Sequence, residues 1–178
     1  QILRELGAEV VSIGVAPDGF NINEECGSTK PEKAQKAVLE NCADIGICLD
    51  GDADRVLFID EQGKLANGDQ VIGLLARAWM KKNLLNKNTV VATVMSNLAL
   101  ELYLEKIGVS LIRTQVGDKN VSKCMNRQSL NLGGEQSGHL ILSDYSNAGD
   151  GLITSLQVLS VLVESQKKES KLFNLFDP

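Results

Sequence analysis

The most constraining feature of the sequence is a short acidic segment enclosed by two apolar runs. In residues 50–55, DGDADR, three aspartates alternate with small residues and an arginine follows at once. Residues 45–49 and 56–59 are continuous apolar runs, which are typical of buried β-strands. Alternate side chains of an extended segment point the same way. The pattern therefore predicts three carboxylates that converge at the end of a rigid sheet, where binding sites of α/β proteins lie.

Carboxylates this close together cannot all stay ionised unless a cation joins them or protons return. A hard divalent ion with oxygen ligands meets this requirement, and Mg²⁺ is expected when a phosphate shares the site. We therefore predict that Asp50, Asp52 and Asp54 bind Mg²⁺. The alternative is a solvated acidic turn, since Asp and Gly are ordinary turn residues, but the apolar runs on both sides favour a binding site.

Two other classes of acidic loop share part of this pattern. An EF-hand loop beginning at Asp50 would have Glu61 at its twelfth position, as required, but Arg55 would replace the glycine of its sixth. Its flanks would also be helices rather than strands, which excludes this class. A phosphatase with an aspartate nucleophile also carries an Asp-x-Asp motif after a buried strand. It needs a separate lysine and further acids, and this alternative stays open.

Composition and charge narrow the function classes. The chain is 43% hydrophobic and carries a net charge of -5 without a basic patch, so nucleic acid is not an expected partner. No segment reaches the roughly 18 apolar residues of a membrane-spanning helix, and no signal peptide is visible. The four cysteines form no Cys-x-x-Cys pair, which indicates small buried residues in a reducing, cytoplasmic compartment. His139 is the single histidine, which excludes a multi-histidine metal site within the chain.

Strand and helix patterns alternate along the chain, which predicts an α/β fold with mainly parallel sheets. Helical spacing and cap residues predict helices at residues 1–7, 30–41, 70–82, 97–107, 118–127 and 151–167. The caps are a capping box of Thr29 and Glu32 and the segments 67–69, 96–97 and 149–151. Apolar runs predict strands at residues 8–14, 43–49, 56–60, 89–95 and 109–116, with further strands on both sides of 133–139. Residues 171–178 have the pattern of a linker or frayed end.

A break near residues 65–69 divides the chain into two units, residues 1–66 and 67–178. We predict two three-layer α/β units with mixed, mainly parallel sheets, the first incomplete at its N-terminus. The chain starts without Met in the back half of a helix, so we interpret it as a piece of a longer protein.

A second candidate loop occupies residues 133–139. Glu135, Ser137 and His139 alternate and can share one face, and their hydrogen-bonding groups suit sugar hydroxyls. Glycines nearby, Gly134 among them, let a backbone approach a ligand. The alternative is a glycine-rich hairpin with one exposed histidine.

A third candidate lies at residues 116–120, where a predicted strand meets a predicted helix. Such junctions present backbone N–H groups to anions. Asp118 and Lys119 are therefore candidates for the site, with Asp118 as a simple helix cap as the alternative.

Together these segments resemble the α-D-phosphohexomutase family. The matching motifs are DGDADR (50–55), NGDQVIG (67–73), TVMSN (93–97), VGDKN (116–120), GGEQSGH (133–139) and GDGL (149–152), joined by PDGFNIN (17–23) and GSTKPE (27–32). The family has four domains, and this chain resembles most of the second and all of the third. The family interconverts a hexose 6-phosphate and 1-phosphate through a bisphosphorylated intermediate.

The resemblance implies a role for each candidate residue. The three aspartates would bind Mg²⁺, and the phosphoserine of the first domain would complete its shell, so this chain alone should bind metal weakly. Arg55, His139 and Asp118 would be catalytic, with Arg55 beside the transferring phosphoryl group. Glu135, Ser137, Gly134 and Lys119 would bind the substrate.

The implied substrate is a hexosamine phosphate, glucosamine 6-phosphate, because hexose-specific relatives tend to carry Gly-His where this chain has Gly117-Asp118. The alternatives are a phosphomannomutase or phosphoglucomutase, or a non-catalytic fragment that binds metal and sugar phosphate. The implied partners are the missing first and fourth domains and, for the full-length enzyme, a second copy.

Three features depart from the family: the phosphoserine motif and the phosphate loop of the fourth domain are absent, and Lys119 replaces an arginine. A milder change is Ala53, in place of a glycine of the metal loop.

Overall fold

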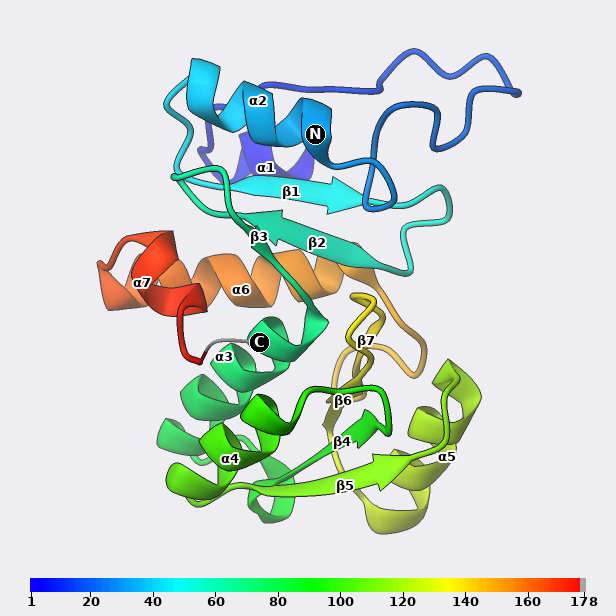
Figure 1. The fold of residues 1–178 in the computed structure, drawn as a ribbon, viewed down its shortest axis with the longest axis vertical. Helices are drawn as coiled ribbons and strands as arrows, with labels where there is room; N and C mark the ends of the chain where they lie inside the picture. The colour runs from blue at the N-terminus through cyan, green and yellow to red at the C-terminus, as the bar shows by residue number, and fades with distance from the viewer. Residues whose placement is uncertain (177–178) are drawn as a thin grey trace.

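The computed structural model describes residues 1–176, and two sheets organise it (Figure 1). The first sheet has the order β1 (Gly46–Leu49), β2 (Val56–Ile59), β3 (Leu65–Ala66), and all of its described pairings are antiparallel. The second has the order β5 (Ser110–Thr114), β4 (Thr89–Thr93), β6 (Leu132–Gly134), β7 (Leu140–Leu142). In it, β4 pairs in parallel with β5 and β6, and only β7 runs antiparallel.

Seven α-helices and one 3₁₀-helix accompany these strands in the described residues. They are α1 (Ile2–Glu5), α2 (Glu32–Glu40), α3 (Gly68–Lys81), the 3₁₀-helix η1 (Asn86–Asn88), α4 (Leu98–Lys106), α5 (Asp118–Gln128), α6 (Gly151–Ser165) and α7 (Glu169–Phe173). The predicted α/β class is confirmed, with the mainly parallel pairing confined to the second sheet.

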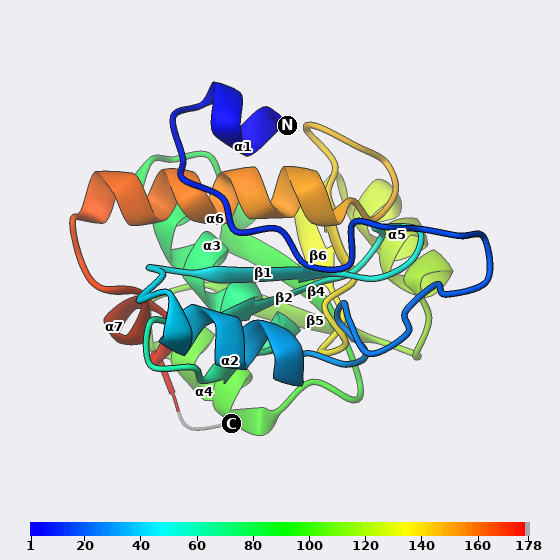
Figure 2. The ribbon, with the colours of Figure 1, turned by 90° about the horizontal axis from the view of Figure 1, so that it is seen from above.

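Each sheet lies between helices. Figures 1 and 2 show α2 and α6 on opposite sides of β1 and β2. The alternation of side chains along a strand explains this: Ile59 packs with Val38 of α2, whereas Phe58 packs in the cluster that includes α6. In the second sheet Val91 faces α5, while Val90 faces α3 and α4. Both sheets are therefore the middle layer of three.

One apolar core joins the two sheets. Val56 and Phe58 of β2 belong to the same buried cluster as residues of α3, β4 and α6. The aromatic ring of Phe173 in α7 stacks on that of Phe58, with the ring centroids 5.7 Å apart. Apolar packing thus continues across the predicted boundary near residue 66. None of the helices in the described residues is both long and apolar enough to cross a membrane.

Predicted caps account for three helix starts. The Asn67 side chain accepts from Gln70 N and the Gln70 side chain returns the contact, a capping box that starts α3. Asn97 caps α4, and Asp150 Oδ1 accepts from Ile153 N at 2.8 Å to start α6. These short-range signals place the loops that precede the helices.

Three local predictions are wrong. Residues 8–14 form no strand, because Val11 and Ile13 stay exposed and no neighbouring strand pairs with them in the described part of the chain. Thr29 does not cap α2, whose first position follows Pro31. Residues 171–173 complete α7 instead of fraying, because Leu172 and Phe173 are buried. The predicted frayed end also covers residues 177–178, which lie outside the described residues.

Candidate functional site

The acidic segment is the connection of a β-hairpin. Leu49 pairs with Val56, so residues 50–55 close the hairpin. The loop turns tightly, with Ala53 N donating to Asp50 O at 3.2 Å and Ala53 at a φ of 59°. Carboxylate oxygens of Asp50, Asp52 and Asp54 lie within 4.8 Å of one another. The hairpin therefore brings together the three side chains that the sequence predicts as a group.

This spacing fits a divalent cation. Oxygens that share one ion at 2.0–2.6 Å lie at most about 5.2 Å apart. The three carboxylates meet that limit and are the hard, anionic ligands that Mg²⁺ and Ca²⁺ prefer. The donor set therefore has the chemistry of a site for a hard divalent cation.

Two basic groups border the acidic loop. Arg55 Nε lies 3.9 Å from Asp50 Oδ2 and 3.8 Å from Asp54 Oδ1. His139 Nδ1 lies 3.1 Å from Asp54 Oδ2, and the histidine is buried. Asp54 thus lies between an arginine on the same loop and a histidine that directly precedes β7 of the second sheet.

The charge around Asp54 is unbalanced without a cation. Burial raises the pKa of its carboxyl group, the nearby His139 opposes that shift, and the charges of Asp50 and Asp52 add to it. A raised pKa means that ionised Asp54 is less favourable here than in water. A divalent cation among the carboxylates would reverse this preference.

Backbone hydrogen bonds hold the histidine beside the acidic loop. Arg55 and His139 form an isolated antiparallel bridge, and Val56 N donates to Gly138 O at 3.0 Å. Gly138 has a φ of 93°, and a Cβ there would lie 2.3 Å from Val56 O. Only glycine fits such a close approach. The two candidate loops, residues 50–55 and 133–139, are distant in the sequence but adjacent in space, and main-chain contacts join them.

The remaining members of the 133–139 segment have different surroundings. Glu135 Oε1 accepts from Gly117 N at 3.0 Å, which joins this segment to the third candidate loop. Ser137 is exposed. A Cβ at Gly134 would lie 2.7 Å from His139 O, so that glycine permits close pairing of β6 with β7.

Asp118 and Lys119 begin α5. Gly117 is the N-cap and no side chain caps the helix, so Asp118 is not its cap. Both residues line an open pocket of about 410 Å³ that His139 also lines. His139 thus borders both this pocket and the Asp54 carboxylate of the acidic loop.

The start of α6 is part of the site, although the sequence indicates only a helix cap there. Gly151 N donates to Ala53 O at 2.8 Å, which docks α6 onto the acidic loop. A Cβ at Gly149 would lie 2.3 Å from His139 Nε2, a buried nitrogen without a partner in the described residues. The glycines of the GDGL motif indicate this role, because they lie where the backbone contacts two other candidate loops.

The comparisons with known proteins agree with this geometry. The family model described as "Phosphoglucomutase/phosphomannomutase, alpha/beta/alpha domain III" matches residues 67–178. A phosphoglucosamine mutase of Zymomonas mobilis is 58% identical over 99% of this chain, and one of Parvibaculum lavamentivorans is 57% identical over all of it. The chain spans about 40% of the length of each relative.

Solved structures share the fold. A phosphoglucomutase/phosphomannomutase family protein of Burkholderia thailandensis superposes with a TM-score of 0.87 at 24% identity, over 99% of this chain and 39% of that one. An Aspergillus fumigatus N-acetylphosphoglucosamine mutase, solved with GlcNAc-6P and magnesium, superposes with a TM-score of 0.69 at 21% identity, over 87% and 38%. With its motifs, its fold and the family match all in agreement, the chain belongs to the phosphoglucomutase/phosphomannomutase family.

Proposed function

We propose that the protein containing this chain is a phosphoglucosamine mutase that interconverts glucosamine 6-phosphate and glucosamine 1-phosphate. The observation that carries the proposal is the cluster of Asp50, Asp52 and Asp54 held beside Arg55 and His139. Relatives at 57–58% identity that bear this name support the choice of sugar. The reaction would serve cytoplasmic synthesis of amino-sugar precursors for the cell wall.

The three aspartates would hold Mg²⁺. When bound, this ion would neutralise charge on the phosphoryl group in an in-line transfer. The donor of that group would be a phosphoserine from a domain outside this chain, and a bisphosphorylated sugar would be the intermediate. The chain's own contribution is a preformed carboxylate cluster, fixed by the hairpin register and by Gly151.

Arg55 would bind the oxygens of the transferring phosphoryl group. Its Nε faces two carboxylates, while its terminal nitrogens form no hydrogen bond within the described residues. The side chain is about half exposed, so its planar fork is accessible to an anion. The neighbouring carboxylates limit how far the guanidinium can turn, which orients the fork.

His139 would hold or transfer a proton at the sugar hydroxyl. A proton on Nδ1 is donated to Asp54 Oδ2, which leaves Nε2 as the reactive nitrogen. Because Gly149 covers Nε2, this role requires the segment before α6 to move when the sugar enters. Glu135, whose Oε1 is engaged by Gly117 N, would offer Oε2 to a sugar hydroxyl, and Ser137 would offer its hydroxyl. Gly134, at the end of β6, would let the backbone lie close to the substrate.

Asp118 would favour an amino sugar. Its carboxylate lines the pocket beside His139 and would attract the ammonium group of glucosamine, while Lys119 would attract the phosphate. A lysine supplies charge without the bidentate fork of an arginine. We therefore assign Lys119 a supporting role in binding.

The test is a mutase assay of the full-length protein on three sugars. We expect kcat/KM for glucosamine 6-phosphate to exceed that for mannose 6-phosphate and glucose 6-phosphate by at least about 100-fold. Equal or better turnover of mannose or glucose phosphate would instead establish the phosphomannomutase or phosphoglucomutase alternative. The 178-residue chain alone is expected to show no turnover, and measurable conversion by it would contradict the phosphoserine mechanism.

A further inference from the structure

The segment after β4 lies at a ligand-binding edge but has little apolar packing of its own. β4, β5 and β6 run parallel, so the segments that follow them leave the sheet at one edge. We call residues 93–97 the β4 loop. Its tip, Val94 and Met95, is 50% and 63% exposed. Polar contacts must therefore hold the loop in place.

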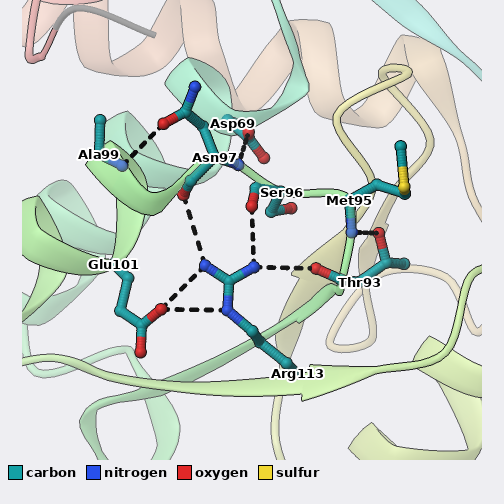
Figure 3. A network of polar contacts seen from close by, with 8 residues as sticks. All are labelled: Asp69, Thr93, Met95, Ser96, Asn97, Ala99, Glu101 and Arg113. Carbon is teal, nitrogen blue, oxygen red and sulfur yellow. Dashed lines mark hydrogen bonds and ion pairs between the residues drawn. The ribbon is translucent and has the colours of Figure 1, made fainter.

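One guanidinium supplies most of these contacts (Figure 3). Arg113 of β5 donates from Nη1 to Ser96 O at 2.8 Å and to Thr93 O at 3.3 Å, and from Nη2 to Asn97 O at 3.5 Å. Its Nε and Nη2 both donate to Glu101 Oε2 of α4, at 3.0 and 2.9 Å. A single planar group thus joins three carbonyls of the β4 loop to a carboxylate.

A buried carboxylate fixes the other side of the β4 loop. Asp69 is fully buried, and its Oδ2 accepts from Asn97 N at 2.8 Å (Figure 3). A buried carboxylate is costly unless hydrogen bonds or nearby positive charge compensate for its lost hydration. Asp69 lies in the first turn of α3, where the helix dipole offsets part of that cost.

The same turn of α3 reaches the segment that carries Glu135. Gly68 N donates to Gln136 O at 3.0 Å, and a Cβ at Gly68 would lie 2.0 Å from Glu135 O. The β4 loop, the start of α3 and the 133–139 segment are therefore joined through consecutive contacts. Their spacing is set by Arg113 on one side and Asp69 on the other.

We propose that Arg113 is a positioning residue for sugar-phosphate binding. By holding three carbonyls of the β4 loop, it keeps that loop at a fixed distance from the segment with Glu135 and Ser137. The inference rests on the proposed function for what binds at this edge. A lysine in place of Arg113 keeps the charge but cannot reach three carbonyls and Glu101 in one plane.

The first test compares Arg113→Lys and Arg113→Ala in the full-length protein. We expect KM for glucosamine 6-phosphate to rise about tenfold with lysine and further with alanine, with a smaller change in kcat. Affinity for Mg²⁺ should stay unchanged, because the acidic loop lies on the first sheet. Lys82→Ala is the matched control, since it removes the 2.6 Å contact to Glu164 at the opposite end of α3. An unchanged KM in both Arg113 variants, or an equal rise in the control, overturns the proposal.

A second measurement separates this inference from the proposed function. Ser96 N donates to Thr93 O at 3.1 Å inside the β4 loop. In Arg113→Lys we expect this amide to exchange with solvent about tenfold faster, with Val90 to Ala92 of β4 unchanged. Unchanged exchange at Ser96 overturns the positioning role whatever the substrate is. Faster exchange in an enzyme that rejects glucosamine 6-phosphate supports the positioning role and refutes only the assigned sugar.

Discussion

The acidic loop and the carboxyl edge of the second sheet are built in opposite ways. The acidic loop takes its three carboxylates from residues 50–54, within one hairpin. The edge is assembled from Asp69, the β4 loop, Gly117 and Glu135, which lie far apart in the sequence. The acidic loop is therefore a local structure, whereas the edge is a network of contacts between elements.

The difference predicts how each region tolerates change. The Asp52 carboxylate can be lost without disturbing the register, because backbone pairing of β1 with β2 holds the loop. A contact of the edge also holds two elements together, so its loss affects stability as well as binding. Substitutions in the acidic loop should therefore change binding without changing stability, and substitutions at the edge should change both.

The largest effect is expected from Gly68→Ala, at the centre of the edge. The new Cβ would lie 2.0 Å from Glu135 O, a backbone atom that cannot turn away. We expect a loss of about 3 kcal/mol in the free energy of unfolding, measured by denaturant titration. Gly108→Ala is a control that carries backbone strain alone, since a Cβ there meets nothing within 4 Å but the φ of 78° should still cost about 1 kcal/mol. Equal losses in the two variants would show that the edge is not tightly packed at Gly68.

Asp52→Ala should affect metal binding without affecting the fold. Asp52 is exposed and the hairpin does not depend on it, but it is one of the three clustered carboxylates. We expect Mg²⁺ affinity to fall on the order of 100-fold by calorimetry, with the melting temperature almost unchanged. Glu105→Ala, at an exposed carboxylate on α4, is the control. Unchanged affinity in Asp52→Ala would mean that the loop is only a turn.

Glu61→Ala tests how much the contact between the end of β2 and α7 stabilises the fold. Glu61, just after β2, accepts from Ser170 Oγ at 2.5 Å and from Ser170 N at 2.9 Å. We expect a loss of about 1 kcal/mol in unfolding free energy. Ser170→Ala combined with Glu61→Ala completes a double-mutant cycle, and additive losses would show that the pair does not interact.

The contribution of Glu61 should depend on pH. Burial raises the pKa of Glu61, but the hydrogen bonds from Ser170 outweigh it and leave the pKa below its ordinary value. A lowered pKa means that the stabilisation is complete above the ordinary value, about 4.3, and is lost as the pH falls through the lowered one. The difference in unfolding free energy between the parent and Glu61→Ala should therefore shrink in acid, and a constant difference from pH 7 to pH 3 would contradict this assignment.

The smallest effect is expected from Ala53→Gly in the acidic loop. Ala53 has a φ of 59°, which glycine adopts at little cost. The gain is partly offset by the greater freedom of glycine in the unfolded chain, so we expect a stabilisation of about 0.5 kcal/mol. Ala37→Gly, in α2, should instead destabilise by about 1 kcal/mol. A loss of stability in Ala53→Gly would show that the turn carries no strain.

The acidic loop could be predicted from the sequence, because residues within one hairpin define it. Two apolar runs and a turn define a hairpin, and the alternation of acids defines the face they share. The caps at Asn67, Asn97 and Asp150 could be predicted for the same reason, since each acts within three residues. The approach of His139 to Asp54 joins two sheets, and only the family resemblance brought the two residues into one site.

Apart from the Thr29 cap, the errors and omissions concern interactions between distant residues. Residues 8–14 have a strand pattern, but a strand also needs a partner at its edge. The short helix α7 depends on the stacking of Phe173 on Phe58, which residues 169–173 alone do not reveal. Arg113 looks like an ordinary charge on a strand, and its three carbonyl partners appear only when β4 and α4 are placed beside it.

The core that spans both sheets has a consequence for cooperativity. Phe58 and Val56 lie in the first sheet, yet the apolar surface that buries them comes from α3, α6 and α7. A chain cut between residues 66 and 67 would expose that surface on both halves, and neither half would keep a complete core. We therefore expect the two halves to unfold in a single transition.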